Sequence, residues 1–354
     1  MPLTNKTIWF PEPHKAEIRE EAVREPGVDE ILVRTSRTLV STGTEMTAYC
    51  HDFLPGTNWE KYFSCPYVPG YNNVGTVVSV GKGVDASLVS KRVATLGNHA
   101  AYVTMNIYGG RSADSDHLES SKTPKYNLVP DGIDDDDAVF FTIAEIVMNG
   151  VRASRIQWGE CAAVYGLGLL GQFAARFMRL SGAIPVFAVD LSDHRLGLLP
   201  DDPAIFRVNP SRESAADAIA RVLGKRKVDA VLEVTGNSRL LPEQARLLRQ
   251  KGRLVLIGSA KHPVEFNFED DCSQPSISII GAHNYSHPIF PQPDYPWTIS
   301  RDIDYFFELL KYRQIDVKPL VGRKIDYREA PEAYRELEKD RGNQMGVIFD
   351  WSEA

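Results

Sequence analysis

The feature that most constrains the fold of this chain is a glycine-rich hexapeptide set between an apolar strand and an apolar helix. Gly166, Gly168 and Gly171 form the pattern G-x-G-x-x-G. The pattern directly follows the predicted strand 162–165 and directly precedes an apolar segment that extends to residue 180. In such a unit the first glycine allows a tight turn, the second admits a pyrophosphate to the backbone, and the third permits close packing of helix on strand. The hexapeptide therefore predicts an α/β fold of the Rossmann type, with a doubly wound parallel sheet that binds a dinucleotide at the start of a helix.

The choice of dinucleotide is predicted from Asp190. The next apolar strand, VFAVD, ends at Asp190, nineteen residues after Gly171. A carboxylate at this point binds the adenosine ribose hydroxyls and repels a 2′-phosphate, so NAD is expected rather than NADP. Arg195 either lies over the adenine or is a solvated helix residue. The other residues expected at the cofactor are Leu169, Leu170, Thr235 and Gly258. The last two end the following parallel strands and fit simple strand-to-loop turns equally well.

Two patterns divide the chain. Residues 1–149 carry short β-branched strands separated by Gly, Pro and Asn, which is typical of a β-rich domain. Strands alternate with helices over residues 150–285, as in a parallel sheet covered by helices on both faces. Residues 286–354 begin near the pattern-breaking FPQPDYPW and are too few for a third domain, so they are expected to return to the first.

The individual elements can be placed approximately. The strands predicted in the first part are 30–35, 75–80, 92–96 and 101–105. Those predicted in the second part are 161–165, 185–190, 228–235, 253–259 and 276–282, with helices at 169–181 and 242–250. A helix at 299–312 and a strand at 345–350 are expected in the last part. Residues 106–125 are polar and rich in turn formers, so they are expected to form a surface loop without assigned chemistry.

Composition excludes several classes of protein. The 354 residues, 43% hydrophobic and 25% charged, are typical of a soluble protein of two domains. A net charge of −7 has the wrong sign for binding nucleic acid or an anionic membrane. No apolar run approaches the roughly 20 residues of a membrane span, and the N-terminus lacks a signal-peptide pattern, so we expect a cytoplasmic protein. The four cysteines have no CxxC or CxxH spacing, which predicts neither a disulfide framework nor a structural zinc lobe.

Several segments together resemble the medium-chain dehydrogenase/reductase superfamily over essentially the whole chain. They are PGYNNVGTVVSVGKGV, KRVATLG, GLGLLG with VDLSDHR, and EAPEAYRELEKDR with MGVIFDW. The segment STGTE at 41–45 is similar to a branch that includes bacteriochlorophyllide dehydrogenase and the bi-domain sugar or polyol oxidoreductases. The resemblance implies a GroES-like substrate and catalytic domain, formed by residues 1–149 and 286–354, beside the Rossmann domain.

The chain departs from the zinc-dependent members of that superfamily. At the positions where those proteins carry catalytic zinc ligands, the sequence has Thr42, Tyr71, Asn72 and Thr142. Hydroxyl and amide groups are poor ligands for zinc, which prefers thiolate, imidazole and carboxylate. We therefore expect no metal at these positions.

Without zinc, side chains must take the proton from a substrate hydroxyl and stabilise the developing alkoxide. Glu145, one helical turn after Thr142, is the first candidate for the base, because a carboxylate in an apolar run is costly to bury without a partner. An exposed helix residue or a salt bridge is the alternative. Tyr71 is expected to donate or relay a proton, with Asn72 orienting it, unless Tyr71 only fills the space that a zinc ion would leave.

Four more residues are expected near the reaction. Glu45 stands where the zinc pattern has an Asp behind its ligands and is either catalytic or structural. His99 and His283 are candidate substrate contacts or bases that titrate near neutral pH, and each fits a packed or surface histidine as well. Thr42 is the other candidate substrate contact. A metal site shifted to His99 and Glu145 is a further alternative.

The resulting hypothesis is a zinc-independent, NAD-dependent dehydrogenase that oxidises a secondary alcohol of a sugar, cyclitol or other polyol. Its expected partner is therefore a small hydroxylated molecule. Two alternatives remain: an NADPH-dependent quinone or enoyl reductase, against which Asp190 argues, and a non-catalytic NAD-binding sensor. The apolar segment 276–282, at an otherwise open sheet edge, predicts a homodimer.

Overall fold

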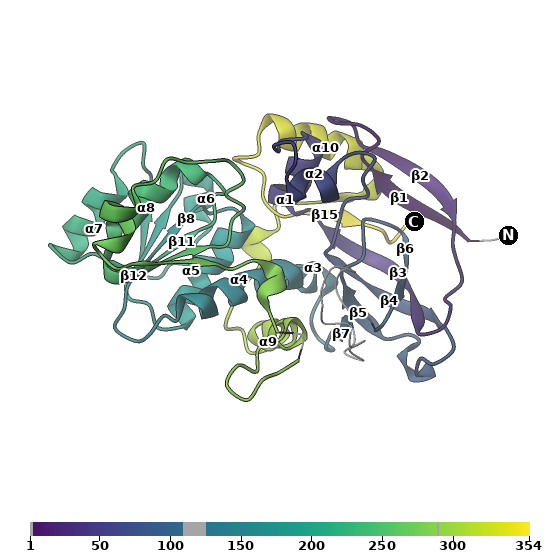
Figure 1. The fold of residues 1–354 in the computed structure, drawn as a ribbon. Coiled ribbons are helices and arrows are strands. Elements are labelled where there is room, and N and C mark those ends of the chain that lie inside the picture. Colours follow the sequence, from purple (N-terminus) through teal and green to yellow (C-terminus); the bar gives the residue numbers. More distant parts are fainter. Residues whose placement is uncertain (1–2, 109–124, 289) are drawn as a thin grey trace. The chain divides into compact units, whose positions relative to one another are not determined.

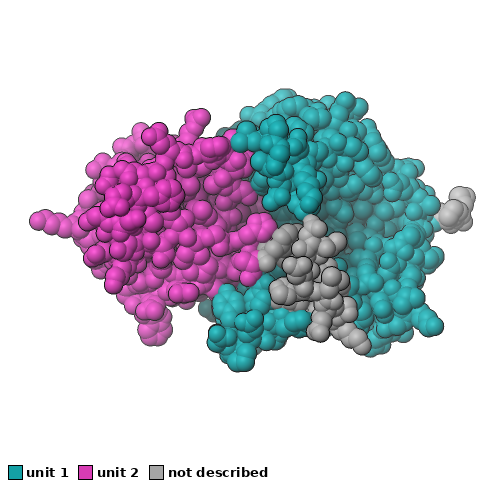
Figure 2. All heavy atoms as spheres, viewed as in Figure 1, with its two compact units in different colours: residues 1–142, 287–354 teal, residues 143–286 magenta. Residues whose placement is uncertain are grey.

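The computed structural model describes residues 3–108, 125–288 and 290–354 and contains two compact units. Unit 1 comprises residues 1–142 and 287–354, and unit 2 comprises residues 143–286 (Figure 2). The first division point falls inside helix α4 (Phe141–Ser154), seven residues earlier than the predicted boundary after residue 149. The reason is that α4 packs on unit 2. A Cβ added at Gly150 would lie 2.3 Å from Cδ1 of Ile257, which directly follows a strand of that unit.

Unit 2 contains a six-stranded sheet in which all neighbouring strands are parallel (Figure 1). The spatial order is β10-β9-β8-β11-β12-β13. The strands are β8 (Ala162–Tyr165), β9 (Val186–Val189), β10 (Ile205–Val208), β11 (Val228–Glu233), β12 (Leu248–Leu256) and β13 (Ser278–Gly281). The chain order thus reverses between β8 and β11, and such sheets bind ligands beyond the carboxyl ends of the strands at this point. The predicted Rossmann fold is confirmed.

The helices of unit 2 connect these strands and cover both faces of the sheet, with α5 and α8 on opposite sides in Figure 1. After α4 they are α5 (Leu169–Leu180), α6 (Asp193–Gly197), α7 (Ala215–Leu223) and α8 (Leu241–Leu247). Serine caps start two of them, because the side chains of Ser192 and Ser214 accept the amides of Arg195 and Asp217.

Unit 1 contains a seven-stranded, mainly antiparallel sheet of order β14-β15-β3-β4-β5-β7, with β6 also paired to β3, and a separate pair β1-β2. The strands are β1 (Thr4–Trp9), β2 (Glu17–Ala22), β3 (Glu30–Leu39), β4 (Asn73–Val80), β5 (Arg92–Thr95), β6 (Tyr102–Asn106), β7 (Tyr126–Leu128), β14 (Arg323–Asp326) and β15 (Val347–Asp350). β15 pairs antiparallel with β3, with Ile348 opposite Leu39. The end of the chain therefore completes a sheet that residues near its start begin.

The helices of unit 1 lie between and beside these strands. They are α1 (Thr42–Tyr49), α2 (Asn58–Phe63), α3 (Asp135–Ala138), α9 (Ile299–Lys311) and α10 (Ala330–Lys339). Helix α10 packs on α1 through a buried aromatic cluster, in which the ring of Phe10 lies edge-on to Tyr49 and Tyr334 at centroid distances of 5.3 and 4.8 Å. This packing fixes the position of the buried face of α1.

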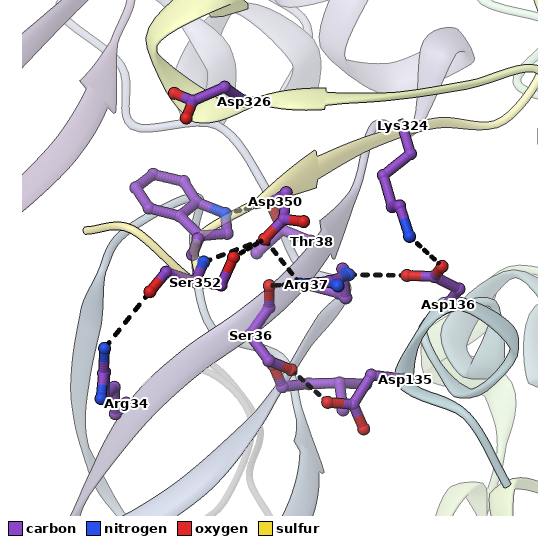
Figure 3. Close-up of polar contacts among 12 residues, drawn as sticks. Arg34, Ser36, Arg37, Thr38, Asp135, Asp136, Lys324, Asp326, Asp350 and Ser352 are labelled. Carbon is purple, nitrogen blue, oxygen red and sulfur yellow. Dashed lines mark hydrogen bonds and ion pairs between the residues drawn. The ribbon is translucent and has the colours of Figure 1, made fainter.

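Charged side chains connect β3 to the last strands and to α3 (Figure 3). Arg37 on β3 donates to Asp136 at 2.6 Å and to Asp350 at 2.7 Å, and Lys324 reaches the other oxygen of Asp136 at 2.7 Å. Burial raises the pKa of Asp136, but the two cations outweigh that effect and leave it below its ordinary value. The network holds the returning segment against β3.

Some predicted elements differ from the structure. Residues 248–250, predicted as the end of a helix, begin strand β12, because they lie beside β11 with Leu248 opposite Val228. The pair β1-β2, the strands β10 and β14, and the short helices of unit 1 were not predicted. Residues 109–124 of the predicted loop lie outside the described residues. Within the part of the chain that is described, no helix has the length and apolarity to cross a bilayer.

Candidate functional site

The three glycines after β8 differ in their backbone angles and in the space around them. Gly166 has φ of +91°, a conformation that L side chains rarely adopt. A Cβ at Gly171 would lie 1.7 Å from the carbonyl oxygen of Gly166, so only glycine lets α5 begin this close to the turn. A Cβ at Gly168 would meet nothing within 4 Å. Gly168 is also the N-cap of α5 and provides no capping side chain. The turn thus leaves open space at the start of a helix, which fits a pyrophosphate.

Asp190 lies directly after β9 and is 9% exposed. Its Oδ2 accepts the amide of Leu167, within the glycine turn, at 2.6 Å, and its Oδ1 accepts the amide of Ser192 at 2.8 Å. Nη1 of Arg195 lies 3.6 Å from Oδ2. Since a carboxylate offers about four acceptor positions, Asp190 keeps capacity for ribose hydroxyls while it fixes the turn. Arg195 is thereby placed beside the predicted ribose position.

The strands next to β8 end against the same turn. A Cβ at Gly166 would lie 2.9 Å from Cγ2 of Thr235, which follows β11. Gly258, after β12, packs equally closely, since its Cβ would lie 2.8 Å from the amide nitrogen of Gly236. Thr235 and Gly258 therefore lie with the glycine turn at the carboxyl edge of the sheet, and their contact with a cofactor stays a prediction.

A buried glutamate that the sequence analysis missed organises this edge. Glu233, the last residue of β11, is fully buried and accepts hydrogen bonds from the hydroxyl of Thr235 at 2.5 Å, the amide of Gly236 at 2.8 Å and the side-chain amide of Gln244. Burial raises the pKa of Glu233, although these donors oppose the effect. The signal was a carboxylate that directly follows the apolar residues 230–232 at the end of this strand.

In unit 1, hydroxyl groups gather around Tyr71. The hydroxyl of Tyr71 shares a short hydrogen bond with that of Ser41 and donates to Thr44 Oγ1 at 3.2 Å. The hydroxyl of Thr142 donates to the carbonyl oxygen of Tyr71 at 3.2 Å. Thr42 begins α1 beside this group and is half-buried. Ser41 and Thr44 were not predicted. We call Ser41, Thr44, Tyr71 and Thr142 the hydroxyl cluster.

This donor set does not fit a zinc ion. Three of the positions that carry ligands in zinc-dependent dehydrogenases hold hydroxyl groups, and those of Tyr71 and Thr142 are engaged in the hydrogen bonds above. Asn72 is fully buried and its side-chain amide donates to the carbonyl of Leu39 at 3.1 Å. Zinc sites in proteins are built from thiolate, imidazole and carboxylate, none of which these four positions offer.

Glu45 lies at the centre of a buried polar group in unit 1. Its Oε1 accepts the amide of Ser41 at 2.7 Å, and its Oε2 accepts the hydroxyl of Tyr334 at 2.5 Å and lies 3.0 Å from Nε2 of His99. Glu45 and His99 are fully buried, and burial together with Glu45 raises the pKa of Tyr334. Through these contacts Glu45 and His99 have a structural function, because they hold the start of α1 to α10. That Glu45 takes part in catalysis and that His99 contacts the substrate both remain predictions.

Glu145 and His283 belong to unit 2. Glu145 is fully buried on α4, three residues after Thr142, so the two side chains lie on the same side of this helix. Burial removes the carboxylate from water, which excludes the alternative of an exposed helix residue. His283 is exposed, and its carbonyl oxygen accepts the side-chain amide of Asn149 at 3.0 Å. The proposed chemical functions of both residues remain predictions.

Comparisons with known proteins agree with this architecture. A model of the family described as zinc-binding dehydrogenase matches residues 170–300. D-guloside 3-dehydrogenase of Escherichia coli (strain K12) is 28% identical over 230 residues, which are 64% of this chain and 65% of that protein. The chain thus spans about 65% of the length of that relative. D-xylulose reductase of Scheffersomyces stipitis is 24% identical over 335 residues, 88% of this chain and 89% of that protein.

Among solved structures, an alcohol dehydrogenase of Escherichia coli CFT073 complexed with NADH superposes with a TM-score of 0.79. The two sequences are 17% identical, and the match covers 98% of this chain and 99% of the other. Such a likeness shows that both units share the fold of that protein.

Proposed function

We propose that the chain, which belongs to the medium-chain dehydrogenase/reductase superfamily, is an NAD-dependent dehydrogenase that oxidises a secondary alcohol of a sugar, cyclitol or other polyol. The observation that carries the proposal is the glycine turn of unit 2, with open space at Gly168 and a carboxylate at Asp190. Similarity to D-guloside 3-dehydrogenase and D-xylulose reductase supports the substrate class.

The turn and the strand ends around it would hold the cofactor. Gly166, Gly168 and the first amides of α5 would receive the pyrophosphate, Asp190 the adenosine ribose, and Thr235 and Gly258 the nicotinamide end. When bound, nicotinamide supplies the hydride acceptor. Asp190 favours NAD, because its negative charge repels a 2′-phosphate.

The proton of the substrate hydroxyl leaves through side chains of this chain. Glu145 is the proposed proton acceptor, since its burial removes the competition of water for its carboxylate. The hydroxyl of Tyr71 is proposed to hold the substrate oxygen, because its hydrogen bonds to Ser41 and Thr44 fix its position and offer a path for a proton. No step of this proposal uses a metal at the hydroxyl cluster.

A hydroxyl-rich substrate suits the hydroxyl cluster. The hydroxyls of Tyr71 and Thr142 donate within the cluster, and each keeps an acceptor position for a substrate hydroxyl.

Unit 2 also offers a surface for self-association, because β13 is an edge strand and Ile279 on it is 39% exposed. We propose a homodimer that forms through this edge and acts in the cytoplasm.

The test is NADH formation, followed by near-ultraviolet absorbance, against sugars, cyclitols, linear polyols, simple alcohols and quinones. Each assay is run with and without a chelator on protein of known metal content. Glu145→Gln and Tyr71→Phe are compared with Glu332→Gln and Tyr62→Phe, two exposed residues that serve as matched controls.

Polyol oxidation that survives chelation and falls only in Glu145→Gln and Tyr71→Phe supports the proposal. Turnover that stops with the chelator while the protein stays folded would contradict a metal-free reaction. NADPH oxidation with quinones and no polyol turnover would instead favour a reductase, and cofactor binding without any turnover would favour a sensor.

A further inference from the structure

Three side chains of the kinds that zinc proteins use as ligands come together in unit 1, away from the hydroxyl cluster. His14 lies between β1 and β2, Cys50 is the C-cap of α1, and Glu338 lies on α10. One donor atom of each lies within 4.8 Å of the other two. Nδ1 of His14 is 2.7 Å and Sγ of Cys50 is 4.0 Å from Oε1 of Glu338. We propose that His14, Cys50 and Glu338 bind a Zn²⁺ ion that joins these three segments.

The backbone holds His14 in place for this purpose. His14 has φ of +63°, a left-handed conformation that histidine, like asparagine and aspartate, adopts more often than most residues other than glycine. Its amide donates to the carbonyl of Tyr49 at 2.7 Å, and its own carbonyl accepts the hydroxyl of Tyr49 at 2.8 Å. Tyr49 directly precedes Cys50, so the same contacts bring the imidazole to the thiol.

The donor atoms suit zinc in kind and in spacing. Imidazole nitrogen, thiolate sulfur and carboxylate oxygen are its preferred ligands, and water can take the fourth position of a tetrahedron. Bonds of about 2.0–2.3 Å place the ligand atoms of such a tetrahedron about 3.3–3.6 Å apart. The present separations of 2.7 and 4.0 Å lie on either side of that range. The third separation, between the donor atoms of His14 and Cys50, is at most 4.8 Å, so small movements of partly exposed side chains would complete the site.

Charged side chains of both signs flank Cys50. Oε1 of Glu338 and Nη2 of Arg341 each lie 4.0 Å from its Sγ. Zinc binding would release the thiol proton, and the ion would then balance Cys50 and Glu338.

The proposed site is distinct from the reaction site. Thr42 and Cys50 stand at opposite ends of α1, and eight residues of helix separate them by about 12 Å. His14 and Glu338 come from opposite ends of the chain, and both meet the end of α1. The ion would therefore fasten the β1–β2 connection and α10 to α1 without touching substrate or cofactor.

The experiment titrates metal-stripped, full-length protein with Co²⁺, which reports thiolate ligation by a near-ultraviolet charge-transfer band. The wild type should bind one equivalent and show the band. Cys50→Ser should lose the band. His14→Asn, which tolerates the left-handed conformation, and Glu338→Gln should weaken binding about tenfold or more, since even residues that only support metal ligands are worth about 10–100-fold. Cys272→Ser in unit 2 and Glu332→Gln on α10 are the matched controls and should bind as the wild type does.

Thermal unfolding with and without Zn²⁺ gives an independent readout. Zn²⁺ should raise the midpoint of the wild type and the controls but not that of Cys50→Ser. Absence of the band in the wild type, or its persistence in Cys50→Ser, would overturn the proposal. Loss of the band in Cys272→Ser would also overturn it. None of these measurements depends on dehydrogenase turnover, so the two proposals can fail separately.

Discussion

Replacing Asp190 with Asn tests whether this carboxylate sets the cofactor preference. Asn has nearly the same shape as Asp but no charge. Its carbonyl can still accept one of the two amides, those of Leu167 and Ser192, that now bond to Asp190. The amide left without an acceptor costs about 1–3 kcal/mol of stability, so the variant is expected to be less stable but still to fold. Its main effect should be on the charge that a 2′-phosphate would meet.

The expected change in NADPH affinity follows from Coulomb's law and from the positive charge of Arg195. Two unit charges about 4 Å apart repel by about 4 kcal/mol at an effective dielectric constant of about 20, which applies to a site near the protein surface. The guanidinium of Arg195, 3.6 Å from Oδ2 of Asp190, attracts the same phosphate and offsets part of the repulsion. If about half remains, removing the carboxylate improves NADPH binding by about 2 kcal/mol, or about 30-fold.

The assay measures the dissociation constants of NADH and NADPH from the fluorescence of the bound cofactor, which requires no substrate. Asp190→Asn should lower the ratio of the NADPH constant to the NADH constant about 30-fold. Asp193→Asn, an exposed carboxylate on the adjacent α6, is the matched control and should leave the ratio unchanged. An unchanged ratio in a folded Asp190→Asn variant would refute the placement of the ribose beside Asp190.

Three further predictions concern catalysis, the glycine turn and alkaline pH. Glu145→Gln should lower kcat by about 10²–10⁴-fold with little change in KM, and a wild-type kcat would exclude Glu145 as the base. Gly171→Ala should lower both the unfolding midpoint and NADH affinity, because its Cβ would lie 1.7 Å from the oxygen of Gly166, whereas Gly168→Ala should lower affinity alone; equal midpoints for the two variants would contradict this. The raised pKa of Tyr334 means that only the unfolded state loses this proton above about pH 10, so stability falls as pH rises. Urea unfolding of Tyr334→Phe should therefore show a slope that is smaller by about 1.4 kcal/mol per pH unit, and an unchanged slope would show that Tyr334 ionises in the folded protein.

Much of the nucleotide site could be predicted because its requirements are local. Gly166, Gly168 and Gly171 lie within six residues of one another. The space and the backbone angles of a single turn are what each position depends on. Alternation of apolar strands and helices likewise depends on neighbouring residues, so it predicts a parallel sheet. The end of a predicted helix was misplaced at Leu248, because pairing with β11 outweighed the helical pattern there.

The side chains that converge from distant segments could not be predicted in the same way. Glu45 accepts the hydroxyl of Tyr334, 289 residues away in sequence, and His14 meets Glu338 across 324 residues. Glu233 is visible as a carboxylate, but its three donors come from a turn and a helix whose packing no local pattern specifies.

The sequence by itself thus determined the strand-turn-helix unit, the carboxylate after the second strand, and the absence of zinc-type donors at Thr42, Tyr71, Asn72 and Thr142. These features depend on residue type and short-range spacing. Only the tertiary structure decided that Tyr71 lies among hydroxyls, that Glu45 is enclosed, and that the two ends of the chain meet beside Cys50. The physical reason is that the packing of segments far apart in the chain depends on the whole core, while backbone sterics and hydrophobic periodicity act between neighbours.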